Sequence, residues 1–301
     1  MPEQSSSTAA AGKTIATLIP REQKPSYKVW LRFRRNKIAM VSLAFILLEF
    51  FVALFPQLLT HYDPLKGDYA ETWEMPSAKH LMGTDDLGRD QLARLIYGAR
   101  ISISIGILSQ LIIGIIGLPI GAMAGLVGGW YDYILMRIID ILSSIPIIFL
   151  YILLLIAIGG GFQNILLALG LTGWIGIARL VRGQVLTLKE TDYVRAAMGM
   201  GATTTQILAK HIIPNSLTPV IISMALGIPG AMFAEAGLSF IGLGVPPPTP
   251  SWGQMIGRYQ TYIQTFWHLT VFPALILALT MLAYIFVGDG LRDALDPNIR
   301  V

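Results

Sequence analysis

Two glutamates stand inside apolar stretches of this sequence, Glu49 in the first stretch and Glu235 in the fifth. A carboxylate is costly to place in hydrocarbon, so it commonly faces the protein interior or water, where it can carry protons or line a transport pathway. Pro229 and Gly230 precede Glu235 and could open the helix beside it. The alternative for each glutamate is a buried carboxylate that accepts hydrogen bonds from a neighbouring helix or subunit. The candidate pathway or gate residues are therefore Glu49, Pro229 and Glu235.

Other reactive groups are sparse. The chain has no cysteine, which excludes disulfides, zinc–thiolate sites and iron–sulfur clusters. Its four histidines are scattered, and no His-Glu-x-x-His or similar ligand spacing occurs. We therefore expect no catalytic residue, no metal site and no cofactor in this chain.

Membrane-spanning helices are the elements that must position these residues. The 301 residues are 54% hydrophobic and 13% charged, and their mean hydropathy is +0.62. This is about half the charge of an ordinary soluble domain, so the bilayer is the expected solvent. The net charge of +4 comes from residues beside hydrophobic stretches, which indicates membrane topology and not nucleic-acid binding.

Six transmembrane helices are predicted from apolar runs of sufficient length. A triple glycine at 159–161 separates the third from the fourth. Only six of the 22 basic residues then fall outside, which places both termini in the cytoplasm. The predicted spans are 38–59, 101–127, 134–158, 164–182, 216–241 and 269–288. Between and around them we expect a basic, largely disordered cytoplasmic tail (1–37), an extracytoplasmic loop (60–100), a cytoplasmic loop (183–215) and a cytoplasmic C-terminus (289–301).

The cytoplasmic loop contains a polar segment rich in small residues. Asp192 can cap a helix that begins at Tyr193, and Gly201 suits the left-handed position that ends it. Thr203 or Thr204 can start a second short helix that ends near Pro214. Such a helix-turn-helix could enter a groove on another protein, or it could rest on lipid headgroups as an amphipathic loop.

This segment resembles the cytoplasmic loop of ABC importer permeases, whose pattern is Glu-Ala-Ala, three residues, Gly, nine residues, Ile-x-Leu-Pro. Arg195 stands where that family has the glutamate and His211 where it has the isoleucine. The resemblance implies a coupling helix between the fourth and fifth spans that fits a cleft in the ATPase subunit. The residues it assigns to ATPase coupling are Tyr193, Arg195, Ala196, Ala197, Gly201, Ile207, Ile213 and Pro214.

Further motifs resemble the second permease of dipeptide and oligopeptide import systems. They are residues 83–90 with 97–102, 238–244 with 251–253, and 288–297. The stretch 179–184 is similar to the oligopeptide branch, while nickel and glutathione importers share much of the pattern. The resemblance implies an all-α integral membrane protein with the six-helix fold of type I ABC importer permeases.

The partners that the resemblance implies are a homologous second permease, two ATPase subunits that bind Mg-ATP, and an extracytoplasmic peptide-binding protein. Membrane lipid is also expected to contact the chain, in a bacterial inner membrane. One alternative is a secondary transporter driven by protons through Glu49 or Glu235, although no inverted repeat is evident. Another is a membrane-embedded enzyme, which lacks an acid–base cluster here.

Overall fold

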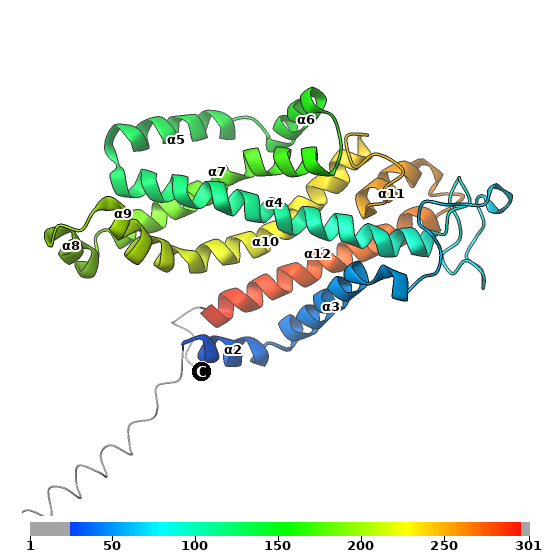
Figure 1. Cartoon of the computed structure of the whole chain (residues 1–301), viewed down its shortest axis with the longest axis horizontal. Coiled ribbons are helices and arrows are strands. Elements are labelled where there is room, and N and C mark those ends of the chain that lie inside the picture. The colour runs from blue at the N-terminus through cyan, green and yellow to red at the C-terminus, as the bar shows by residue number, and fades with distance from the viewer. Residues whose placement is uncertain (1–24, 296–301) are drawn as a thin grey trace, which may run out of the picture.

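The computed structural model describes residues 25–295, and within this range the chain is helical without a β-strand (Figure 1). The two short helices α8 and α9 lie at one end of the molecule, called here the α8 end. Helix α11 lies at the other, called the α11 end. The helices are α2 (Pro25–Arg35), α3 (Lys37–Leu54), α4 (Gln91–Val127), α5 (Gly129–Ser143), α6 (Ile147–Ile158), α7 (Phe162–Leu188), α8 (Asp192–Gly199), α9 (Thr204–Ile207), α10 (Ile213–Phe240), α11 (Trp252–Tyr259) and α12 (His268–Leu295).

Five helical segments are long and apolar enough to cross a membrane: α3, α4, α7, α9 with α10, and α12. Helices α5 and α6 make a sixth span if the bent pair counts as one. The long helices run side by side along the molecule (Figure 1). This arrangement agrees with the all-α membrane fold expected from the sequence.

The third predicted span, 134–158, is broken by a sharp bend. Helix α5 ends at Ser143, and α6 begins at Ile147 with its axis turned by 86°. Pro146 accounts for the break, because proline offers no N–H donor and disfavours helical backbone at the residue before it. Ser144 closes α5 by donating from its hydroxyl to the carbonyl of Ile141 at 2.7 Å.

Several helices extend beyond the predicted spans. Helix α4 starts at Gln91 and not at 101, because Asp90 caps it by accepting from the amide of Ala93 at 2.7 Å. Helices α7 and α12 likewise continue past their predicted ends to Leu188 and Leu295. A helix can outlast the hydrocarbon region, and hydropathy marks only the part inside it.

The tail 1–37 was expected to be largely disordered, but its last part is helical. Residues 25–35 form helix α2, whose Phe33 is buried against α12. The rest of that prediction, residues 1–24, lies outside the described residues, as do 296–301 of the predicted C-terminus.

Glycines allow α4 to pack closely against α7. Gly117, Gly121 and Gly125 follow one another on successive turns of α4. A Cβ atom at Gly121 would lie 2.3 Å from the carbonyl oxygen of Ala178 on α7, which is far inside contact distance. Close approach at small residues is a main source of helix association in lipid. A side chain at Gly121 would force the two helices apart, at about 1–3 kcal/mol for overpacking.

Candidate functional site

The α8–α9 segment, residues 192–214, crosses the α8 end of the bundle (Figure 1). Helix α8 begins at Asp192, so its N-cap is Thr191 and the predicted capping role of Asp192 is wrong. Thr191 has extended backbone, and its carbonyl accepts the amide of Arg195, while its hydroxyl donates back to the carbonyl of Leu188. Asp192 still complements the positive end of the helix dipole from the first turn.

Helix α8 has one buried and one exposed face. Val194 is fully buried in a cluster with Ile207 and Ile212, and Ala197 on the same face is 5% exposed. Burying a valine fully stabilises the docked helix by roughly 1.5–3 kcal/mol. Ala197 and Ile207, both assigned to coupling from the sequence, therefore face the chain's own interior.

The outward face of α8 presents Tyr193, Arg195 and Ala196. Two methionines that the sequence argument overlooked join them, Met198 at 40% and Met200 at 83% exposure. Methionine adapts its shape to irregular partner surfaces, so an exposed pair is typical of a docking face. Their position three and five residues after Arg195 could have indicated from the sequence that they belong to the same docking face.

Arg195 stands where the family pattern has a glutamate. Its guanidinium makes an ion pair with Glu190 of the same chain. Both side chains are more than half exposed, so the pair adds little stability. The ring of Tyr193 lies 5.9 Å from that of His211, the residue that replaces the family's isoleucine. This contact ties α8 to the start of the next span.

The turn after α8 agrees with its predicted geometry. Gly201 has φ +83° and its amide donates to the carbonyl of Met198, which is the left-handed cap expected there. Thr203 then caps α9 through a capping box. Its hydroxyl accepts the amide of Gln206 at 3.3 Å, and its own amide donates to the Gln206 side chain at 2.9 Å.

Pro214 does not end the second helix as predicted. Helix α9 passes through a π-helical turn, Leu208–Ile212, directly into α10, where Pro214 sits in the first turn. Within a continuous helix proline lacks the N–H donor, and its ring crowds the carbonyl four residues earlier. A π turn widens the backbone where the proline ring needs room. Helix α9 is thus continuous with a complete span, and the turn at residues 200–203 joins it to α8.

Glu235 is completely buried near the end of α10. Its Oε1 accepts hydrogen bonds from the hydroxyls of Ser239 at 2.9 Å and Ser251 at 2.8 Å. Helix α10 runs unbroken through Pro229 and Gly230, so the helix is not opened there. These contacts match the structural alternative for Glu235, and its pathway role stays a prediction.

Glu49 lies in α3 and is 5% exposed. Its carboxylate accepts a hydrogen bond from the Thr280 hydroxyl on α12. It also borders an apolar cavity of about 190 Å³ beside Trp252. The bond joins the first and last spans, which again matches the structural alternative.

Helix α11 is held against α4 and α10 by its first residues. Ser251 accepts the amide of Gln254 at 3.0 Å while it donates to Glu235. The amide of Trp252 donates to the Ser102 hydroxyl, and its indole N–H donates to the carbonyl of Leu95, both at 2.9 Å. The motif at 251–253 therefore fixes a short helix across the α11 end.

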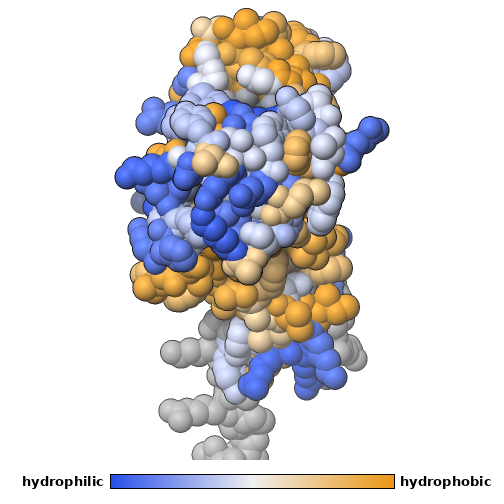
Figure 2. Space-filling view, turned by 90° about the vertical axis from the view of Figure 1, so that its right-hand side faces the viewer, coloured by the Kyte–Doolittle hydropathy of each residue, from blue (hydrophilic) through white to orange (hydrophobic). Residues whose placement is uncertain are grey.

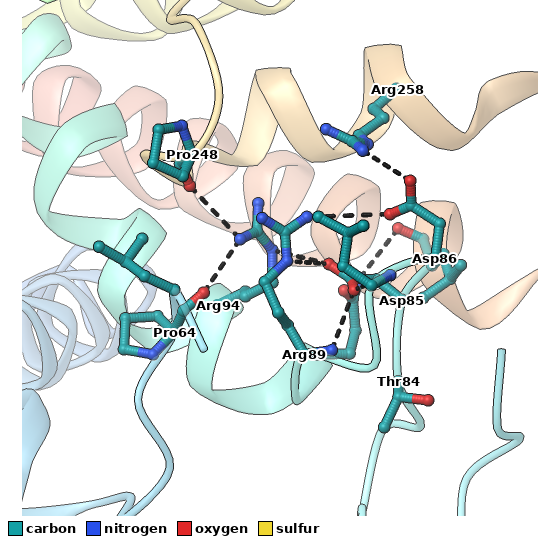
Figure 3. Close-up of polar contacts among 12 residues, drawn as sticks. Pro64, Thr84, Asp85, Asp86, Arg89, Arg94, Pro248 and Arg258 are labelled. Carbon is teal, nitrogen blue, oxygen red and sulfur yellow. Dashed lines mark hydrogen bonds and ion pairs between the residues drawn. The ribbon is translucent and has the colours of Figure 1, made fainter. Parts of the chain in front are cut away.

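A network of buried charges joins the predicted loop to this helix (Figure 3). Asp85 is fully buried and receives Arg89 Nε at 2.7 Å and Arg94 Nε at 3.4 Å. Arg94, also fully buried, donates to the carbonyl oxygens of Pro64 at 3.0 Å and Pro248 at 3.4 Å. Removing one partner of such a pair typically costs 3–5 kcal/mol, because the other charge stays buried. Arg94 therefore anchors two loops to the start of α4.

Asp86 extends the network to α11. It receives Arg258 Nη2 and the Tyr259 hydroxyl, each at 2.6 Å. Burial alone would raise the pKa of the Asp86 carboxyl, but these two hydrogen bonds outweigh burial and the pKa is lowered. Burial and the carboxylates of Asp85 and Asp86 raise the pKa of the Tyr259 phenol. Asp86 is therefore ionised opposite Arg258 at neutral pH, and Tyr259 keeps its proton.

His80 is a second buried anchor in the same loop. Its Nδ1 lies 2.8 Å from Asp90 Oδ2, and its Nε2 lies 3.0 Å from Glu71 Oε2. Burial lowers the pKa of the imidazole, but the hydrogen bonds to the two carboxylates more than compensate and raise it above 6.5. Asp90 is also the N-cap of α4, so the imidazolium holds the loop to that helix.

These anchors were not predicted, because the composition of residues 60–100 is that of a polar external loop. The signal was present in the run 83–90, where two aspartates are followed by an arginine four residues after the first. Figure 2 views the α11 end, where hydrophilic residues gather between hydrophobic surfaces above and below. The loop forms a folded cap with buried ion pairs.

A cavity of about 300 Å³ lies between α4, α6, α7 and α10. Gly173 and Gly176 line it from α7, and Gly227 and Gly230 line it from α10. Its polar groups belong to Gln110, Tyr151 and Ser223. No charged side chain of the described residues lines it. The walls are therefore neutral, with backbone accessible at the glycines.

Two protein families match most of the chain. The family described as "Binding-protein-dependent transport system inner membrane component" matches residues 117–301. A second family, "N-terminal TM domain of oligopeptide transport permease C", matches residues 24–76. Together they account for most of the helices described above.

Curated relatives cover nearly the whole chain. The oligopeptide transport system permease protein OppC of Bacillus subtilis is 44% identical over 282 residues, 92% of each chain. The dipeptide transport system permease protein DppC of the same organism is 43% identical over 272 residues, 90% of this chain and 85% of that one. The glutathione transport system permease protein GsiD of Pectobacterium atrosepticum is 39% identical over 277 residues, 92% of each.

The fold is similar to that of a solved transporter. A chain of the MetNI methionine ABC transporter in an inward-facing conformation superposes with a TM-score of 0.56 at 23% identity. The match covers 68% of this chain and 98% of that one. The helical arrangement, the α8–α9 segment and these matches define a membrane-embedded transport permease with the type I importer fold. The chain belongs to the family of inner-membrane components of binding-protein-dependent transport systems, the permeases of ABC importers.

Proposed function

We propose that this chain is the permease subunit of an ATP-driven importer of short peptides. The substrate class is inferred from sequence identity. This chain is 43–44% identical, over at least 90% of its length, to permeases named for dipeptide and oligopeptide transport. The relative named for glutathione transport is 39% identical, so peptide import is favoured.

The α8 end faces the cytoplasm in this proposal, and the α11 end faces outward. Exposed basic residues support the assignment: Arg34, Arg35 and Lys37 precede the first span, and Arg195 lies on α8. In Figure 1, α2 lies on the side of α3 that is turned toward the α8 end. Cytoplasmic segments near span ends carry an excess of Lys and Arg. Both chain termini are then cytoplasmic, in a bacterial inner membrane.

Coupling to ATP hydrolysis is proposed to pass through α8. Its exposed face, with Tyr193, Ala196 and Met200, would dock in a cleft of the ATPase subunit. Its buried face, through Val194, would transmit the movement to α7 and α10. Two such ATPase subunits would bind Mg-ATP, so this chain itself would hold no cofactor.

The peptide path is proposed to run along the glycine-lined cavity between α7 and α10. A neutral wall with exposed backbone suits peptide amide groups of varied sequence, because no fixed charge selects one side chain. A homologous second permease would supply the opposite wall. An extracytoplasmic peptide-binding protein would deliver peptide at the α11 end.

Reconstituted uptake tests this function. The full complex in vesicles, given its binding protein, should import radiolabelled di- and oligopeptides when ATP is enclosed on the ATPase side. Glutathione and Ni²⁺ serve as competitor substrates. Peptide uptake should be at least tenfold above theirs.

Two results would contradict the proposal. Uptake of Ni²⁺ or glutathione in preference to peptides would show that peptides are not the substrate class. Uptake by this chain without ATPase subunits, driven by a pH gradient and lost in Glu235→Gln, would make it a secondary transporter.

A further inference from the structure

The junction of α2 and α3 carries exposed cations and exposed apolar side chains together. Arg34, Arg35 and Lys37 are all exposed, and no ion pair involving them occurs among the described residues. Trp30 is 46% exposed and Ile38 is 60% exposed on the same short stretch. The interface between bilayer and water favours both kinds of side chain, because cations reach the headgroups while aromatic and aliphatic groups face the acyl chains.

Helix α2 is fixed in place and does not hang free. Phe33 is 7% exposed and packs with Ala39 and Ala294. A Cβ atom at Gly290 of α12 would lie 2.4 Å from the Ala39 side chain and 3.2 Å from the Phe33 ring. The cations are therefore presented on a rigid support at the ends of two membrane helices.

An apolar groove begins beside these cations. It has a volume of about 230 Å³ and lies between α3 and α12, at the surface of the bundle. Val41, which lines it, follows Lys37 by four residues and therefore lies on the same face of α3. The remaining lining residues are Ser42, Phe45, Leu279, Leu282, Ala283 and Phe286.

Charge distinguishes between possible occupants. Asp289 and Asp293 are exposed on the last turns of α12, and Arg292 is exposed between them. Together with Arg34, Arg35 and Lys37, these residues give an excess of two positive charges on the chain segments that continue from the two groove-lining helices. A neutral lipid or an apolar helix of another protein would use the groove alone, whereas an anionic lipid would use the groove and the cations.

We propose that this groove and the adjacent cations bind one anionic phospholipid. Arg34, Arg35 and Lys37 hold its phosphate-bearing headgroup, and an acyl chain lies along Val41 and Phe286. A bound lipid links α2, α3 and α12, so it stabilises the first and last spans against each other. The inference requires only that the chain spans a membrane and does not depend on the transported substrate.

Native mass spectrometry of the full chain, purified in mild detergent with the subunits that accompany it, tests this site. The probes are phosphatidylglycerol and phosphatidylcholine with identical acyl chains. Retention of phosphatidylglycerol should exceed that of phosphatidylcholine by at least about tenfold. The triple variant R34Q/R35Q/K37Q should lower phosphatidylglycerol retention by about tenfold to a hundredfold, since a juxtamembrane cation contributes roughly 1 kcal/mol toward an anionic surface.

A matched pair of variants tests the groove. Val41 and Leu47 are both exposed apolar residues of α3, at 70% and 60%, but only Val41 lines the groove. V41W should reduce retention of phosphatidylglycerol severalfold, and L47W should leave it unchanged. Equal effects of the two variants would refute a specific acyl-chain site.

Other outcomes would also overturn the proposal. Equal retention of the two lipids, or full retention by the triple variant, would remove the headgroup contact. Displacement of phosphatidylglycerol by excess inorganic phosphate would indicate a site for small anions. Loss of a copurifying permease from the triple variant, with lipid retention unchanged, would identify this face as a subunit interface. Because lipid retention is measured without transport, failure here leaves the peptide-import proposal intact.

Discussion

His80 illustrates how single buried groups hold the cap at the α11 end. As an imidazolium it donates to Asp90 and Glu71, and Asp90 in turn caps α4. Arg94 does the same for the residues around Pro64 and Pro248. The sequence could not reveal these pairs, because the partners of Arg94 are up to 160 residues away along the chain.

The raised pKa of His80 gives the stability of the complex a pH dependence. Because the folded pKa lies above 6.5, the stabilisation is fully present below pH 6.5 and is lost as pH rises through the folded value. H80Q should lower stability by about 1–3 kcal/mol at acidic pH, with a smaller difference once the pH exceeds the folded pKa. Thermal unfolding of the purified complex across pH measures this. H61Q is the control, since His61 is exposed, and an equal loss at every pH in H80Q would contradict the linkage.

At the scale of elements, sequence patterns located the spans well and their junctions less well. Hydropathy identified α3, α4, α7, α10 and α12, because these helices are apolar over the full hydrocarbon thickness. It did not detect the 86° bend between α5 and α6, because Pro146 sits inside a run that is apolar on both sides. The burial of Val194 and Ala197 in α8 was not predicted, although their spacing of three residues places them on one face of a helix.

Gly201 should be essential to the shape of the α8–α9 segment. Its φ of +83° is open to glycine but costs a β-branched residue about 1–2 kcal/mol or more, although a Cβ atom there meets no neighbour within 4 Å. G201V should therefore lower peptide uptake per ATP hydrolysed severalfold while membrane insertion and assembly are preserved. Parallel assays of ATPase activity and uptake in vesicles measure the ratio.

Gly199 provides the matched control. It also has open space for a Cβ atom but has helical backbone in α8. G199V should change the uptake ratio much less than G201V. Unchanged coupling in G201V would show that the left-handed turn is dispensable.

The whole molecule consists of a rigid cap at the α11 end, a helical bundle and the α8–α9 segment at the other end. Buried ion pairs around Asp85 fix the cap, and glycine-mediated contacts such as Gly121 with Ala178 fix the bundle. Helix α8 is joined to α7 by residues 189–191 and to α10 by the turn at 200–203 and α9. A force applied to α8 is therefore transmitted to two spans that border the glycine-lined cavity.

The central claim is that the exposed face of α8 docks on an ATPase subunit. Two adjacent alanines test it, because Ala196 is exposed and Ala197 is 5% exposed, and the native chain has no cysteine. A196C and A197C, each the only cysteine of this chain, are treated with a short cysteine-reactive photo-crosslinker in the assembled complex. A196C should cross-link to the ATPase subunit, with a yield that changes when ATP is added, and A197C should not cross-link. Absence of the cross-link from A196C in an assembled, ATP-hydrolysing complex would contradict it.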